Sequence, residues 1–89
     1  MTSVTGYMFS SPTCVPCQVM KPAFTELRED FDSVHWIDVN IQTDPNNVAG
    51  SFGITHVPSM VVIRDGTIVG KVTGTALAEY YRILRQATR

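Results

Sequence analysis

The apolar residues change their spacing between residues 9 and 17, and this change constrains the fold more than any other feature. Residues 4–9 mix β-branched and aromatic side chains and stop at Ser10-Ser11-Pro12, which favours a strand followed by a turn. From residue 14 to residue 31 the apolar positions instead recur every three or four residues, as on one face of a helix. These positions are Cys17, Met20, Phe24, Leu27 and Phe31.

The rest of the chain continues this alternation of strands and helices. Residues 34–41 predict a largely buried strand, and TDPNNVAGSFG (residues 43–53) predicts a loop with one short helix. SMVVIRDGTIVGKV (residues 59–72) contains two apolar runs joined at Asp65-Gly66, a dipeptide typical of a two-residue hairpin turn. Residues 75–86 predict a closing helix whose inward face carries Leu77, Tyr80, Tyr81 and Leu84.

This element order, β-α-β-(loop)-β-β-α, predicts an α/β fold. A right-handed crossover joins the first two strands and makes them parallel. The hairpin then extends the sheet in the antiparallel direction. Because 89 residues suit one domain, we expect residues 1–89 to form a four-stranded mixed sheet with helices on both faces.

Charge and composition exclude several classes of function. The net charge of −1 gives no electrostatic case for a nucleic acid or an anionic membrane as partner. The longest purely apolar run is short, near residues 60–63, so no segment is predicted to span a bilayer. MTSVTGYMFSS at the N-terminus lacks the basic start and the long apolar stretch of a secretory signal. We therefore expect a cytoplasmic protein, with a processed secreted domain as the alternative.

The two cysteines, Cys14 and Cys17, have three possible uses. As a structural disulfide they would close a ring of about four residues, which adds only ~2 kcal/mol of stability in the loop-entropy account. As a zinc site they would need two further ligands, and the only histidines, His35 and His56, lack the short spacing of a zinc finger. No metal site is therefore expected. The third use, a redox-active pair, is typical of C-x-x-C in a cytosolic βαβ pattern.

The chain resembles the thioredoxin superfamily in several motifs over nearly all of its length. The motifs are CVPC at the strand-to-helix turn (residues 14–17), Pro22 inside the first helix, GITHVPS (residues 53–59), RDG in the hairpin (residues 64–66) and Gly74 before the last helix. Thioredoxins proper usually begin with an extra strand and helix, so the resemblance implies a minimal thioredoxin fold. Thr13 and Val15 stand where thioredoxins usually have Trp and Gly.

The resemblance implies a role for each residue of the centre. Cys14 lies where a helix begins, and unpaired N–H groups and the helix dipole favour its thiolate. Cys14 would attack a substrate disulfide, and Cys17, more buried, would resolve the mixed disulfide. Pro16 would limit the start of the helix and set the redox poise. Pro58 resembles the cis-proline of the family, with Val57 offering its backbone to an extended substrate.

Three further residues are candidates for tuning the centre. Met8 stands where thioredoxins usually keep a buried aspartate that deprotonates the inner thiol. Our hypothesis is that Asp38 takes over this proton transfer, through water, and the alternative is an ordinary polar residue at a strand end. His56 either adjusts the Cys14 thiolate or is a solvated loop histidine. Thr13 is the third candidate, whereas Tyr7 and Trp36 are assigned to the core.

Together these features predict a monomeric cytoplasmic thiol-disulfide oxidoreductase that donates electrons to protein disulfides. Because the dithiol carries two electrons itself, no cofactor is expected. The resemblance implies disulfide-bearing proteins as clients, with ribonucleotide reductase as one example, and recharging by a flavin-dependent thioredoxin reductase. The alternatives are a glutaredoxin-like, glutathione-dependent reductase, an oxidase or isomerase, and a thioredoxin-fold adaptor with little turnover. The Gly-Gly and paired acids with which many glutaredoxins hold glutathione are not evident in TGTALAE (residues 73–79).

Overall fold

The computed structural model describes residues 2–89 and has the predicted order of elements. The strands and helices are β1 (Val4–Ser10), α1 (Val15–Asp30), β2 (His35–Asn40), α2 (Val48–Ser51), β3 (Ser59–Arg64), β4 (Thr67–Thr73) and α3 (Leu77–Ala87). Within residues 2–89, no helix is both long and apolar enough to cross a membrane.

The four strands form one mixed sheet in the order β2-β1-β3-β4. β1 pairs with β2 in parallel, while β3 pairs antiparallel with both β1 and β4. The parallel pair is the one that α1 connects, so the α/β fold predicted from the right-handed crossover is confirmed. In this register Met8 of β1 is flanked by Asp38 of β2 and by Met60 of β3.

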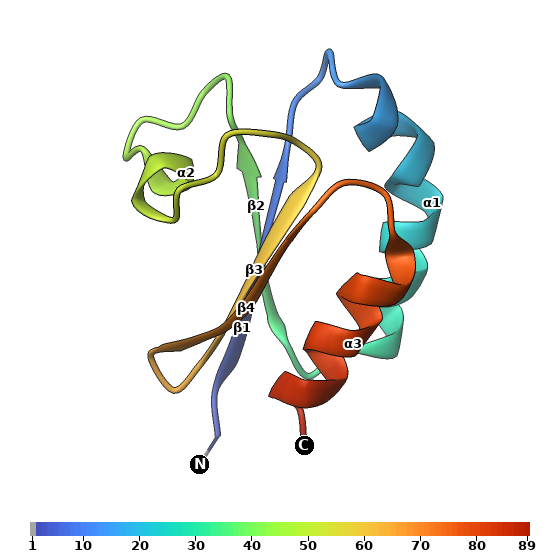
Figure 1. Cartoon of the computed structure of the whole chain (residues 1–89), viewed down its shortest axis with the longest axis vertical. Helices are drawn as coiled ribbons and strands as arrows, with labels where there is room; N and C mark the ends of the chain where they lie inside the picture. The colour runs from blue at the N-terminus through green and yellow to red at the C-terminus, as the bar shows by residue number, and fades with distance from the viewer. Residues whose placement is uncertain (1) are drawn as a thin grey trace.

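Helices cover both faces of the sheet. Figure 1 shows α1 and α3 side by side over one face and the short α2 on the other side. The strand residues divide between two apolar clusters: Met8 packs with Leu27 and Tyr80, and Phe9 packs with Ala49. This division follows from the alternation of side chains along a strand. Tyr7 and Trp36 are partly buried and pack against these clusters.

The hairpin turns at Asp65 and Gly66, as predicted. Both residues have positive φ angles, 50° and 84°. A two-residue turn with both φ angles positive matches the twist of the flanking strands, and Asp-Gly tolerates it at low cost.

The last helix differs from its prediction in where it begins and in which residues it buries. α3 begins at Leu77 rather than at residue 75. Tyr80 and Leu84 are fully buried as expected, but Leu77 and Tyr81 are only half-buried. Ile83, which was not assigned to the inward face, is 4% exposed, because it packs against the face of β4 that Gly70 leaves open.

Candidate active site

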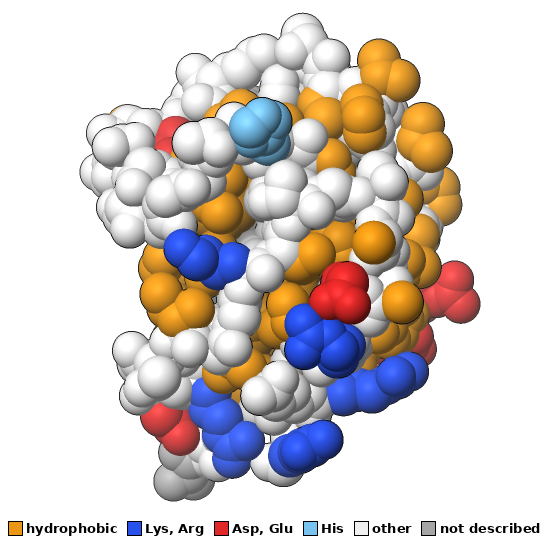
Figure 2. Space-filling model, viewed as in Figure 1, with side chains coloured by type: hydrophobic (Ala, Val, Ile, Leu, Met, Phe, Trp, Pro, Cys, Tyr) orange, Lys and Arg blue, Asp and Glu red, His pale blue; other side chains and the backbone are white. Residues whose placement is uncertain are grey.

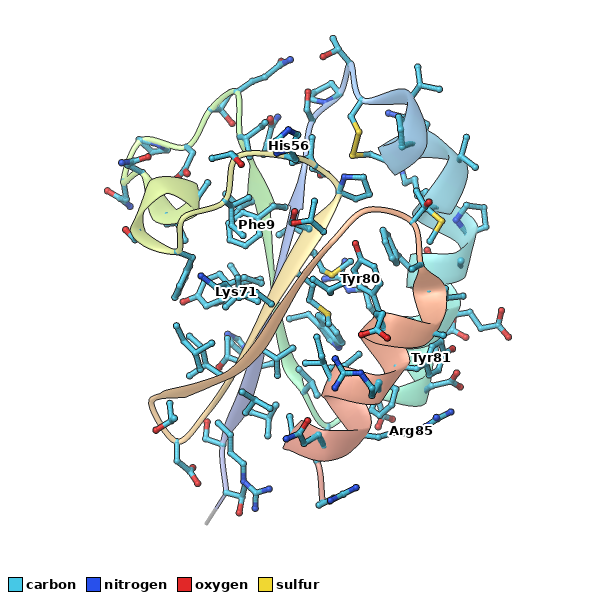
Figure 3. The ribbon with its side chains drawn as sticks, viewed as in Figure 1. Phe9, His56, Lys71, Tyr80, Tyr81 and Arg85 are labelled. Atoms are coloured by element: carbon cyan, nitrogen blue, oxygen red, sulfur yellow. A yellow bond between two sulfur atoms is a disulfide. The ribbon has the colours of Figure 1, made fainter. Side chains whose placement is uncertain are left out.

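The two cysteines form a disulfide where α1 begins. Cys14 is the N-cap residue, and its Sγ accepts a hydrogen bond from the backbone N–H of Cys17 at 3.1 Å. Pro16 lies in the first turn, where its missing N–H removes no helical hydrogen bond. Cys14 is half-buried and Cys17 is only 8% exposed, so Cys14 is the more accessible of the two cysteines. Figure 3 shows the sulfur–sulfur bond at the end of the molecule where His56 also lies.

The segment before β3 faces this disulfide. The carbonyl oxygen of Val57 lies 3.6 Å from Sγ of Cys14, although the two residues are 43 positions apart in the chain. The Val57–Pro58 peptide bond is cis. Val57 is half-buried and Pro58 is buried. The structure therefore brings Cys14, Cys17, Val57 and Pro58 together.

Thr13 belongs to a hydrogen-bond network that holds the turn before Cys14. Its Oγ1 and the Oγ of Ser11 lie 3.1 Å apart, and Nε2 of Gln42 donates to each of them at 3.0 Å. The carbonyl of Ser11 in turn accepts the N–H of Cys14 at 3.1 Å. Gln42 therefore ties the loop after β2 to the start of the redox centre. Gln42 was not among the predicted site residues, because nothing in a lone glutamine of a polar loop indicates its distant partners.

A cleft of about 480 Å³ is lined by residues of α1, β1 and β2. Cys17, Met8, Arg28 and Asp38 are among its lining residues. Asp38 binds the guanidinium of Arg28 through both carboxylate oxygens, at 2.9 and 3.0 Å. The side chain of Asp38 remains 67% exposed, so water reaches it. The structure therefore places Asp38 in the same cleft as Cys17, and among the described residues the side-chain hydrogen bonds of Asp38 go to Arg28.

His56 is exposed on the loop that leads to Val57 (Figure 3). Its ring Nδ1 lies 2.9 Å from Oγ1 of Thr55, and this is the hydrogen bond that the ring makes within residues 2–89. The structure does not bring the imidazole into hydrogen-bond contact with either sulfur. Nor do the described residues contain a group of three or more His, Cys, Asp or Glu side chains that could hold a metal ion.

Two buried hydroxyl groups behind the centre were also missed. Ser59 Oγ donates to the carbonyl of His56 at 2.6 Å. The hydroxyl of Tyr80 donates to the carbonyl of Gly74 at 2.7 Å, and the Pro58 carbonyl lies 3.4 Å from the same oxygen. Burial raises the pKa of Tyr80 to about 12, so the hydroxyl remains a donor at neutral pH. The apolar spacing of α3 predicts that Tyr80 is buried but not what its hydroxyl binds.

An apolar surface surrounds the start of α1. Val15 and Val19 are 70% and 71% exposed, and Figure 2 shows hydrophobic side chains gathered over this part of the helix. Val15 follows Cys14 directly, and Val19 lies one helical turn further on. Exposed aliphatic side chains next to a reactive sulfur suit contact with another apolar surface.

The chain is similar to thioredoxins in sequence. The family model Thioredoxin matches residues 7–85. Thioredoxin 1 of Synechococcus elongatus is 35% identical over 75 residues, which cover 79% of this chain and 69% of that protein. Chloroplastic Thioredoxin F of Oryza sativa subsp. japonica is 36% identical over 66 residues, which cover 74% of this chain and 35% of that protein. The chain thus spans about one third of the rice relative and about two thirds of the cyanobacterial one.

The fold is similar to that of solved thioredoxins. The short form of thioredoxin f from spinach chloroplast matches with a TM-score of 0.88, covering 98% of this chain and 78% of that one. The sequences are 22% identical, so this similarity supports the fold alone. Membership rests on the family model, which covers most of the chain, and on the cyanobacterial relative. The chain therefore belongs to the thioredoxin family, and Cys14 and Cys17 form its disulfide at the start of α1.

Proposed function

We propose that this protein acts mainly as an electron donor that reduces disulfide bonds in other proteins. One observation carries the proposal: the accessible sulfur of Cys14 caps α1, while its partner Cys17 lies one turn further in and is 8% exposed. The helix N-terminus favours a sulfur anion at Cys14, and burial keeps Cys17 away from solvent until the first exchange has occurred.

The two cysteines supply both electrons of the reaction. The Cys14 thiolate attacks one sulfur of a substrate disulfide, forms a mixed disulfide with it and releases the other sulfur as a thiolate, which takes up a proton. Cys17 then loses its proton and attacks Sγ of Cys14, which forms the Cys14–Cys17 bond and releases the second substrate thiol. Two electrons pass from the protein to the substrate, so no organic cofactor is required.

The main chain of Val57 is proposed to bind the extended segment around the substrate disulfide. Its carbonyl lies 3.6 Å from Sγ of Cys14, at the point where a substrate sulfur must arrive. A segment that pairs there as an added strand would be aligned with the attacking sulfur. Pro16 is proposed to set the redox poise by limiting the start of the helix. Val15 and Val19 support a protein as the partner, because they offer an apolar surface beside Cys14.

Asp38 is proposed to accept the proton of Cys17 through water in the cleft. The two residues line the same cleft, and the exposed carboxylate exchanges protons with solvent. Met8, which pairs with Asp38 in the register of β1 and β2 and lines the same cleft, has no group that takes up a proton. Thr13, through its bond to Gln42, and His56, through the charge of its ring, are proposed to adjust the centre indirectly.

The partners follow from the direction of electron flow. A flavin-dependent thioredoxin reductase is proposed to recharge the disulfide, and ribonucleotide reductase is one proposed client. A dithiol donor works only where the surroundings keep it reduced, so we propose a cytoplasmic setting. We propose that the protein acts as a monomer.

Insulin reduction tests this function. The wild type, with dithiothreitol or a thioredoxin reductase as the electron source, is expected to reduce insulin disulfides, and Cys14→Ser is expected to be inactive. The reduction potential of the Cys14–Cys17 pair determines the direction of electron transfer: a value of about −270 mV marks a reductant and one of about −120 mV an oxidant. Turnover with glutathione and glutathione reductase alone would favour the glutaredoxin-like alternative. A lack of turnover, with stable complexes formed equally by wild type and Cys14→Ser, would favour the adaptor.

A further inference from the structure

Three consecutive carbonyl groups before β3 have different partners. The carbonyl of His56 accepts the hydroxyl of Ser59 at 2.6 Å. The carbonyl of Pro58 accepts the backbone N–H of Gly74 at 2.9 Å. Between them, the carbonyl of Val57 faces Sγ of Cys14 at 3.6 Å. The neighbours of Val57 on both sides are therefore fixed from within the protein, while Val57 itself faces the reacting sulfur.

The fixing groups come from different elements. Ser59 is fully buried at the start of β3, and its Oγ also lies 2.8 Å from Oγ1 of Thr73 on β4. Tyr80 is fully buried on α3, and its hydroxyl donates to the carbonyl of Gly74 at 2.7 Å. The backbone N–H of Gly74 in turn donates to the carbonyl of Pro58, so Tyr80 holds Pro58 indirectly through Gly74. The Tyr80 hydroxyl also lies 3.4 Å from the Pro58 carbonyl itself.

Tyr80 also connects this support to the helix that carries the cysteines. Its ring lies 4.9 Å from the ring of Phe24 on α1, centroid to centroid. Figure 3 shows Tyr80 pointing from α3 into the space between the helices and the sheet. One side chain therefore contacts the helix of Cys14 and the loop that supports Pro58, so their relative position depends on it.

We propose that Ser59 and Tyr80 are positioning residues, whose hydroxyl groups hold the Val57 main chain in place against Cys14 for binding an extended protein substrate. The proposal deepens the function proposed above and rests on it. An extended peptide needs the Val57 carbonyl and its neighbours at a fixed distance from the sulfur, because it bonds to the backbone and to the sulfur at once. A small disulfide needs the sulfur alone.

Three single-hydroxyl variants test the proposal. Ser59→Ala and Tyr80→Phe each delete one positioning hydroxyl and keep almost the same volume. Tyr81→Phe is the matched control, because Tyr81 lies on the same helix and its hydroxyl binds Asp30 instead, at 2.7 Å. Each variant is assayed at 25 °C with insulin and with a small aromatic disulfide, after thermal unfolding shows that it is folded. If one of the two variants does not fold, the other still tests the proposal, and Thr73→Val, which deletes the hydroxyl beside Ser59, serves as a second variant for Ser59 only.

The expected result is selective for the protein substrate. Ser59→Ala and Tyr80→Phe are expected to raise KM for insulin by about threefold to tenfold, the effect of one neutral hydrogen bond, with kcat within twofold of wild type. Their rate with the small disulfide, and both rates of Tyr81→Phe, are expected to stay within twofold of wild type. An insulin KM that stays within twofold of wild type in either variant would overturn the proposal. An equal loss on both substrates would also overturn it, because the hydroxyls would then support the whole centre.

The same assays separate this proposal from the function beneath it. A wild type that reduces insulin, together with variants of unchanged KM, overturns the positioning role and leaves the oxidoreductase in place. A wild type that does not reduce insulin overturns the proposed function and the positioning role together.

Discussion

Asp38 binds Arg28 through both of its carboxylate oxygens at the edge of the cleft that reaches Cys17. The pair spans β2 and α1, and Arg28 also lies over the ring of Trp36 at 5.4 Å. The carboxylate is therefore fixed in position but open to solvent, which suits a group that accepts a proton through water and passes it on.

Replacing Asp38 with Asn is expected to change the pH profile of insulin reduction. Without the carboxylate, Cys17 must lose its proton directly to solvent, so the rising limb of the profile is expected to move to higher pH. At pH 7 the rate is expected to fall by about tenfold or more. Arg28→Gln is the control, because it breaks the same ion pair but keeps the carboxylate, and it should retain the shape of the wild-type profile. An unchanged profile in Asp38→Asn would end the proton-transfer role.

Replacing Cys17 with Ser is expected to trap the reaction halfway. The accessible Cys14 can still attack a substrate disulfide, but no second thiol resolves the product, so a mixed disulfide accumulates. Non-reducing electrophoresis and mass spectrometry of the variant with insulin measure the adduct. Cys14→Ser should form little adduct, because Cys17 is buried. Equal adducts from both variants would contradict the assigned order of attack.

Ionisation of the Tyr80 hydroxyl is expected to destabilise the folded protein at alkaline pH. Its pKa is raised from 10.0 to about 12 by burial, so the folded protein holds this proton more tightly than the unfolded chain. The stabilisation is therefore complete below pH 10 and is lost as the pH rises from 10 towards 12. Urea unfolding of a Cys14→Ser/Cys17→Ser background, with and without Tyr80→Phe, measures the effect without thiol chemistry. Between pH 10 and 12 the free energy of unfolding should fall less steeply with pH in the Tyr80→Phe variant. Equal slopes in the two proteins would contradict the raised pKa of Tyr80.

Replacing Gly6 with Ala is expected to destabilise the fold by about 1–3 kcal/mol through overpacking. A Cβ at Gly6 would lie 2.5 Å from Cζ3 of Trp36, and the indole is held by its own hydrogen bond to the Phe31 carbonyl at 3.1 Å. Urea unfolding should show a lower midpoint concentration, while the dependence of the free energy of unfolding on urea stays unchanged. In a Trp36→Leu background the same change should cost much less. An equal cost in both backgrounds would show that strand propensity, not the indole, is responsible.

Periodic features of the sequence were sufficient to predict the architecture. The spacing of five apolar residues predicts the inward face of α1. Cys17, Met20 and Leu27 are buried, whereas Phe24 and Phe31 are half-buried and pack against the same core. Asp65-Gly66 predicts the hairpin because few other dipeptides accept two positive φ angles. The position of Cys14 at the start of α1 follows from the change of spacing, whereas the placing of Val57 and Pro58 beside it was implied only by the resemblance to thioredoxins.

Contacts between distant side chains could not be predicted in this way. Gln42 reaches Ser11 across 31 positions and Tyr80 reaches Pro58 across 22, and no local pattern encodes such pairs. The burial of Ile83 depends on Gly70 of the neighbouring strand, whose missing side chain leaves the space that Ile83 fills. In each case the information lies in the packing of two elements, which neither element carries alone.

The Cys14 sulfur meets main-chain atoms, the N–H of Cys17 and the carbonyl of Val57, which do not depend on the identity of the side chains at the surface. By contrast, the side chains of Val15 and Val19, next to Cys14, are exposed on the surface and contribute little to the core. Chemistry and partner choice are thus encoded by different atoms. Substitutions at Val15 and Val19 can therefore change which protein binds, while the main-chain groups around the Cys14 sulfur stay in place.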